Sequence, residues 1–225
     1  MNHIAHFLLA PHTELAATGT LLADFHRGAV AATLPNEVGA AIALHRAIDS
    51  HTDGHPVTRA AKALFAPGSR RYAGVALDLY FDHCLAREWE RYAVVPFIDF
   101  VDATYVRLGA GLGAAYVPER MRRMANAMRA EDWLGAYAGF DGVERALLRL
   151  NHAIRHRFAR EVDLLPLAGE LRRLRPELDT AFAVLFPDVM RFAAAQLNAA
   201  SAPARTVSIR WRKGTYDGIT SGNDH

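Results

Sequence analysis

Helical periodicity runs through almost the whole chain, and it limits the fold more than any other feature of the sequence. Apolar residues recur at helical spacing, and no convincing run of alternating strand residues precedes the C-terminal tail. The pattern therefore predicts an all-α fold. Prolines and glycines divide the chain into expected helices at 13–26, 36–52, 57–65, 70–92, 96–110, 118–129, 131–138, 141–158 and 163–198, the last of them broken near Pro176 and Pro187.

Chain length and a change in composition near the C-terminal end predict the domain organisation. A chain of 225 residues can build one substantial core, so we expect a single-domain helical bundle over 1–198. Apolar residues make up 51% of the chain and charged residues 22%, which excludes wholesale disorder. After residue 198 the composition shifts to Ser, Thr, Gly and charged residues, which predicts a mobile or loosely docked tail over 199–225.

Cysteine usage and the N-terminal segment predict a cytoplasmic protein. The lone Cys84 excludes an internal disulfide and fits a reducing compartment. The segment MNHIAHFLLAP lacks the cationic start of a secretory signal, and no segment approaches the roughly 18 apolar residues of a membrane span. A net charge of only +2 and the lack of a binding motif argue against nucleic acid as a partner. The oligomeric state stays open.

The segment ALHRAIDSHTD, residues 43–53, concentrates titratable side chains at the end of an expected helix. His45 and Asp49 lie four residues apart and share a helix face, with Asp53 one turn further along. Imidazole beside carboxylate suits Mn²⁺, Fe²⁺ or Zn²⁺ better than Ca²⁺. The alternative for this pair is a surface ion pair.

Other carboxylates and histidines gather in the same half of the chain. Asp78 and Asp82 are again four residues apart, in an apolar helix where a carboxylate needs a metal, a cation or several donors. Buried arginine salt bridges would satisfy the pair equally well. Asp24 follows a helix and could serve only its turn, and His6 could be a core histidine. Because eight of the 11 histidines fall within the first 83 residues, we expect a metal centre there.

Four segments in this order resemble the acyl carrier protein phosphodiesterase family: MNHIAHFLLA, LLADFHRG, HRAIDSHTD and LDLYFDHCLAREW. The resemblance runs from Met1 to about residue 198. It implies a helical fold like that of the HD superfamily of metal-dependent phosphohydrolases. It also implies removal of 4'-phosphopantetheine from the serine of holo-acyl carrier protein, with Mn²⁺ as the favoured ion and Fe²⁺, Mg²⁺ or Zn²⁺ as alternatives. The family pattern falls on Asn2, Ala5, His6, Leu21, Asp24, Arg27, Gly28, His45, Arg46, Asp49, Thr52, Asp53, Asp78, Asp82, His83 and Trp89.

Phosphodiester hydrolysis requires an activated water, neutralised phosphoryl oxygens and a proton for the departing serine oxygen. Under this resemblance, we expect Asp24, His45, Asp49 and Asp82 to be metal ligands or their immediate supports, with His6 next in line. We expect His83 and Asp53 to act as acid or base, or to orient a ligand. Arg27 and Arg46 could bind the phosphate bidentately, or they could pair with Asp24 and Asp49.

Carrier proteins are acidic, so the resemblance implies a basic docking face near the site. The segment ERMRRMANAMR places Arg122 and Arg123 among methionines on an amphipathic helix, which suits such a face. A solvated helix packed on the core would have the same pattern. Two rival functions stay open: an HD-type phosphohydrolase acting on a nucleotide or other small phosphate ester, and a catalytically silent protein that binds an acidic partner.

Overall fold

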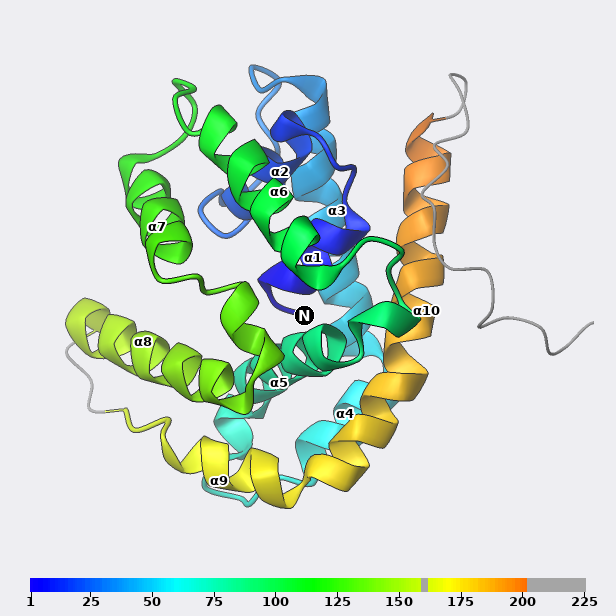
Figure 1. Cartoon of the computed structure of the whole chain (residues 1–225), viewed down its shortest axis with the longest axis vertical. Coiled ribbons are helices and arrows are strands. Elements are labelled where there is room, and N and C mark those ends of the chain that lie inside the picture. Colours follow the sequence, from blue (N-terminus) through cyan, green and yellow to red (C-terminus); the bar gives the residue numbers. More distant parts are fainter. Residues whose placement is uncertain (159–161, 202–225) are drawn as a thin grey trace, which may run out of the picture.

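This computed structural model describes residues 1–158 and 162–201, which form ten α-helices and three short 3₁₀ helices joined by loops (Figure 1). No strand occurs in these two ranges. The α-helices are α1 (His3–Leu9), α2 (Glu14–Leu22), α3 (Asn36–Gly54), α4 (Pro56–Ala63), α5 (Ala73–Arg87), α6 (Phe97–Gly111), α7 (Glu119–Ala130), α8 (Phe140–Phe158), α9 (Pro166–Arg173) and α10 (Arg175–Ser201). The 3₁₀ helices are η1 (Arg70–Tyr72), η2 (Trp89–Arg91) and η3 (Gly135–Ala138). The expected all-α fold is confirmed.

Local signals place some helix ends well and others poorly. Helix α3 begins at Asn36, directly after Pro35, and ends at Gly54, two residues before Pro56. The single helix expected over 70–92 is instead α5 flanked by η1 and η2, so that expectation was wrong at both ends. Helix α1 was not expected, because its seven residues form only about two turns, which are too few to show helical periodicity.

Of the two expected proline breaks in the last helix, the one near Pro176 is confirmed and the one near Pro187 is wrong. The chain bends at Leu174, between α9 and α10. Pro176 lies in the first turn of α10, where a missing N–H costs nothing. Pro187 lies inside α10, and the helix continues through it because Phe186, Val189 and Met190 pack into the core on either side.

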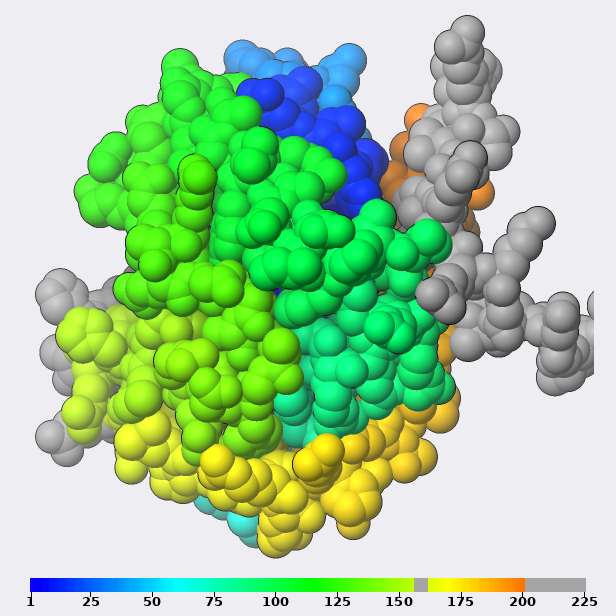
Figure 2. All heavy atoms as spheres, viewed as in Figure 1, coloured from blue at the N-terminus to red at the C-terminus, as the bar shows by residue number. Residues whose placement is uncertain are grey.

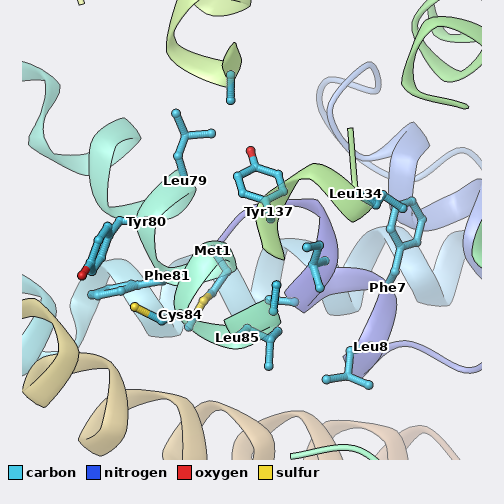
Figure 3. Close-up of a cluster of buried hydrophobic side chains, with 14 of the residues drawn as sticks. Met1, Phe7, Leu8, Leu79, Tyr80, Phe81, Cys84, Leu85, Leu134 and Tyr137 are labelled. Carbon is cyan, nitrogen blue, oxygen red and sulfur yellow. The ribbon is translucent and has the colours of Figure 1, made fainter. Parts of the chain in front are cut away.

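The N-terminal segment lies in the interior. Figure 1 shows the N-terminus near the middle of the molecule, and other atoms cover that place in the space-filling view of the same face (Figure 2). Met1, Phe7 and Leu8 are buried and belong to one core cluster with Phe81 and Leu85 of α5 (Figure 3). Helix α1 is therefore held in place by packing, and its one polar buried side chain, His6, is carried into the interior with it.

Helices α2 and α3 pack closely, and a glycine makes this possible. A Cβ atom at Gly19 would lie only 2.5 Å from the carbonyl oxygen of Val38. Any larger residue would force the two helices apart. This close approach brings the end of α2, and Asp24 just beyond it, against the face of α3 that carries His45.

Helix α10 extends to Ser201, three residues into the tail expected over 199–225. The remainder of that tail, 202–225, lies outside the described residues, so its expected mobility stays a prediction. Within the described part of the chain, no helix has the length and apolar character needed to cross a bilayer.

Candidate metal centre

His6, His45 and Asp49 meet between α1 and α3. Nε2 of His6 lies 2.9 Å from Oδ1 of Asp49, and Nε2 of His45 lies 3.3 Å from the other oxygen of that carboxylate. The two imidazole rings stack with their centroids 3.7 Å apart and their planes 1° from parallel. One ligand atom from each residue lies within 4.8 Å of the others. The predicted pair His45–Asp49 and the predicted His6 thus form one cluster.

Asp24 joins this cluster from the loop after α2. Its carboxylate oxygens lie 3.6 Å from Nε2 of His45 and 3.8 Å from Nδ1 of His3. The backbone N–H of Asp24 donates to the carbonyl of Leu21, so the residue also belongs to a turn, as its sequence context predicts. Asp24 therefore belongs to a turn and also lies beside the cluster, and its role as a metal ligand or support stays a prediction.

Arg46 holds the loop that carries Asp24. Its guanidinium donates to the carbonyl oxygens of Gly28 and His26, each at 2.7 Å. Gly28 has a φ of +79°, a conformation that favours glycine, so the loop geometry depends on that residue. Neither of the expected partners of Arg46, Asp24 or Asp49, receives these hydrogen bonds, and phosphate binding by Arg46 stays a prediction.

Burial and hydrogen bonding set the protonation of the cluster. Burial lowers the pKa of His6 to about 3, which keeps this imidazole neutral. Burial alone would raise the pKa of Asp49, but hydrogen bonds from His45 and His6 outweigh it and lower this pKa well below its ordinary value. The cluster therefore combines a neutral imidazole with an ionised carboxylate, which are the protonation states that bind metals.

Negative charge gathers around the two imidazoles. Besides Asp24 and Asp49, Asp78 of α5 lies 2.8 Å from the α-amine of Met1, and that amine lies 3.9 Å from Asp49. The pKa of the α-amine is raised, because the nearby carboxylates outweigh its burial. Asp49 and Asp78 thus share one ammonium group, and Asp24 adds a third carboxylate beside His45. This excess of negative charge attracts a cation.

The donor set fits a divalent ion. Two imidazoles with one or two carboxylates suit Mn²⁺, Fe²⁺ and Zn²⁺. Nδ1 of His6 and Nδ1 of His45 are buried and find no hydrogen-bond partner in the described ranges. Buried polar atoms are normally paired. Both imidazoles therefore keep binding capacity that protein groups do not use, and the site is compatible with a metal.

Asp82 of α5 binds the start of helix α1, which carries His6. It is fully buried, and its oxygens accept hydrogen bonds from the backbone N–H groups of Ile4 at 2.7 Å, Asn2 at 3.3 Å and Ala5 at 3.4 Å. Burial raises the pKa of Asp82 to about 7, despite these donors. Of the two expected roles, ligand and support, the contacts give Asp82 the second, because it fixes the first turn of α1 and so the position of His6.

Two predicted residues point elsewhere. Nδ1 of His83 lies 2.8 Å from the carbonyl oxygen of Tyr137, and its ring packs edge-on against Tyr80 and Phe140. Asp53 forms an ion pair with Lys62, at 2.8 Å, on the surface. The expected role of Asp53 as acid, base or support is not visible in these contacts, because its carboxylate pairs with Lys62 of α4.

The predicted basic helix packs differently from what a docking face lined by methionines would require. Met121 and Met128 are fully buried in the core. Arg122 donates hydrogen bonds to the carbonyls of Leu112 and Ala114. Arg123 is 70% exposed, and its ion pair with Glu119 is longer, at 3.5 Å. Met121 and Met128 therefore fit the alternative of a helix packed on the core, and Arg123 is the more available cation of the two arginines. Arg27 is exposed.

Sequence patterns did not single out His3 and Tyr137. The hydroxyl of Tyr137 accepts a hydrogen bond from the Asn2 side chain at 2.7 Å, which ties η3 to the start of α1. His3 was one histidine among several in a segment without an assigned helix, and only α1 shows that it faces Asp24. No sequence pattern around Tyr137 could have indicated its role, because that role depends on a contact with Asn2, 135 residues away in the chain.

Comparison with known proteins identifies the family of this chain. The family model described as acyl carrier protein phosphodiesterase matches residues 1–189. The chain belongs to the acyl carrier protein phosphodiesterase family. Residues in all four segments that suggested it lie in or beside the cluster: His6, Asp24, His45, Asp49 and Asp82.

Curated relatives carry the same name. The acyl carrier protein phosphodiesterase of Pectobacterium atrosepticum is 30% identical over 200 residues, which cover 87% of this chain and 99% of the relative. Those of Enterobacter sp. strain 638 and Escherichia coli O139:H28 are 34% and 36% identical over 148 residues, 65% of this chain and 76% of each relative. No solved structure matches the chain, so the likeness to the HD fold stays a prediction.

Proposed function

We propose that this chain hydrolyses the phosphodiester bond between 4'-phosphopantetheine and the serine of holo-acyl carrier protein, which yields the apo form. Family membership and the names of the relatives support the substrate. The observation that carries the chemistry is the meeting of His6, His45 and Asp49 beside Asp24. Small-molecule phosphatases need the same chemistry, but nothing in these contacts favours a nucleotide.

His6, His45 and Asp49 would hold a divalent ion, with Asp24 beside them. When bound, such an ion lowers the pKa of a coordinated water and polarises the phosphoryl oxygens. We favour Mn²⁺, with Fe²⁺ and Zn²⁺ as alternatives, because mixed imidazole and carboxylate donors suit these ions. Mg²⁺ is a weaker alternative, because it prefers oxygen ligands. Asp82 keeps His6 in position by fixing the first turn of α1.

A histidine at the edge of the cluster is best placed to protonate the departing serine oxygen. His3 is partly exposed, lies 3.8 Å from Asp24 and lines an open cavity, so a substrate can reach it. His83 is buried and turned toward the carbonyl of Tyr137. We therefore transfer the expected acid role from His83 to His3.

The carrier protein would dock beside the Asp24 loop, over α7. Arg120, at the start of α7, donates to the carbonyl of Phe25 at 2.8 Å and places this helix against the loop. Exposed Arg123 lies on the same helix and can attract an acidic protein. We also propose a cytoplasmic location, which the free and buried thiol of Cys84 supports.

Mass spectrometry of the carrier protein tests the proposed function. Holo-carrier incubated with the metal-loaded chain should lose the mass of the whole prosthetic group, and a chelator added beforehand should prevent this loss. Addition of excess Mn²⁺ should again allow release of the prosthetic group. An unchanged holo mass with Mn²⁺ present would refute the proposed activity, and equal loss with excess chelator would refute its dependence on a metal.

A further inference from the structure

A cavity of 310 Å³ opens next to the metal centre. Its wall includes His3 and Asp78, which contact Asp24 and the α-amine of Met1 at the cluster. The remaining wall comes from α5, α7, α8 and the η3 region, including Leu79 and Tyr137, both drawn in Figure 3. Pockets that hold small ligands measure about 300–1,000 Å³. The cavity is therefore large enough to receive part of the substrate.

The lining of this cavity is largely apolar, with one unpaired cation. Leu79, Met124, Trp133 and Leu150 supply apolar surface. Arg149 of α8 is partly buried, and its guanidinium lies 4.3 Å from the centre of the Trp133 ring. Within the described ranges, no carboxylate lies at ion-pair distance from Arg149. Its N–H donors are thus free to bind an oxygen of a ligand.

The chemistry of the prosthetic group matches this wall. Beyond its phosphate, 4'-phosphopantetheine carries a branched apolar carbon, then two amides and a thiol. A phosphate at the cluster would direct this arm either into the cavity or into solvent. Apolar contacts favour the branched carbon, and Arg149 can donate to an amide carbonyl.

We infer that this cavity binds the pantetheine arm of the substrate, with Arg149 as donor to one of its amide carbonyls and Trp133 as the apolar wall beside it. This inference rests on the proposed function and adds the place where the arm lies. Arg149 then determines affinity for the arm as a hydrogen-bond donor. Ala146 does so because it is a small, buried residue of the wall, where a larger side chain would fill the cavity.

Calorimetry with two probes tests the inference on the full metal-loaded chain. The probes are 4'-phosphopantetheine, which has the arm, and inorganic phosphate, which lacks it. Wild type should bind 4'-phosphopantetheine at least about tenfold more tightly, equivalent to about 1.4 kcal/mol. Arg149→Gln and Ala146→Leu, which shortens the cavity, should each weaken 4'-phosphopantetheine about tenfold and leave phosphate unchanged. Arg145→Gln on the same helix, where Arg145 pairs with exposed Asp141, should change neither.

Other outcomes would overturn the inference. Equal affinity of wild type for the two probes would show that the arm makes no contacts. Equal weakening of both probes in Arg149→Gln would make Arg149 a phosphate-binding residue. If Ala146→Leu fails to fold, as judged by circular dichroism, Arg149→Gln decides alone. Since binding is measured without turnover, a chain that releases no phosphopantetheine from holo-carrier would refute the proposed function separately.

Discussion

At the scale of single residues, the centre depends on how α1 and α3 pair their side chains. Stacked imidazoles from His6 and His45 share one carboxylate, Asp49, and buried Asp82 fixes the helix that carries His6. An unpaired buried carboxylate costs several kcal/mol, and the backbone donors to Asp82 offset part of this cost, although burial still raises its pKa to about 7. The residue therefore contributes to the site without touching the two imidazoles.

We predict that His45→Ala and Asp24→Ala each reduce the release of phosphopantetheine at least about 100-fold while the protein stays folded. In the proposed centre His45 would offer an imidazole nitrogen to the ion, and Asp24 lies 3.6 Å from Nε2 of His45. If Asp24 served only its turn, its loss should cost about 1 kcal/mol of stability and little activity. Bound metal, helicity and turnover should be measured on the same preparations.

His12→Ala is the matched control, because His12 is an exposed histidine outside the cluster. It should retain both activity and bound metal. Near-normal turnover in a folded His45→Ala or Asp24→Ala protein would remove that residue from the site.

At the scale of elements, α7 separates two arginines that the sequence treated alike. Arg122 donates to the carbonyls of Leu112 and Ala114 and so holds the connection between α6 and α7. Arg123, one residue further along, points to solvent. We expect Arg122→Ala to lower the free energy of unfolding by about 1 kcal/mol.

We predict that Arg123→Glu raises KM for holo-carrier about threefold to tenfold at low salt, with little change in kcat. The difference from wild type should shrink as salt screens the attraction that wild type has for an acidic partner. Arg59→Glu on α4 is the control, since α4 and α7 lie well apart in Figure 1. Identical kinetics of Arg123→Glu and wild type at low salt would move the docking face elsewhere.

A second link between elements predicts a pH dependence of stability. Asp188 of α10 lies 2.8 Å from Nε2 of His51 on α3, and this hydrogen bond, with the pairing to Arg191, lowers the pKa of Asp188. A carboxyl pKa that is lower in the folded than in the unfolded state stabilises the fold above pH about 4. That stabilisation is lost as the pH falls through the folded-state pKa.

Asp188→Asn should therefore lower the free energy of unfolding by about 1 kcal/mol at neutral pH, a modest value because the side chain is 32% exposed. The difference from wild type should shrink below pH about 4. Denaturant unfolding followed by circular dichroism between pH 3 and 7 measures it, with the exposed Asp102→Asn as control. A difference that stays constant over this range would contradict the assigned hydrogen bond.

At the scale of the whole molecule, periodicity predicted the helical class and proline and glycine signals predicted α3, but the site needed the tertiary structure. Helical spacing put Asp78 and Asp82 on one face of α5, yet only the position of α1 decides that Asp78 meets the α-amine while Asp82 meets backbone N–H groups. His6 depends on a seven-residue helix that packing stabilises. The roles of Tyr137 and Arg149 depend on long-range contacts that no local pattern contains.

The most direct test of the metal centre is a titration of the metal-stripped full chain with Mn²⁺, in which bound ion and released phosphopantetheine are measured in the same samples. For wild type, release should rise in parallel with bound Mn²⁺, and Asp49→Ala should bind the ion at least about tenfold more weakly. Full release by the metal-stripped wild type, or Mn²⁺ affinity of folded Asp49→Ala equal to that of wild type, would contradict the centre formed by His6, His45 and Asp49.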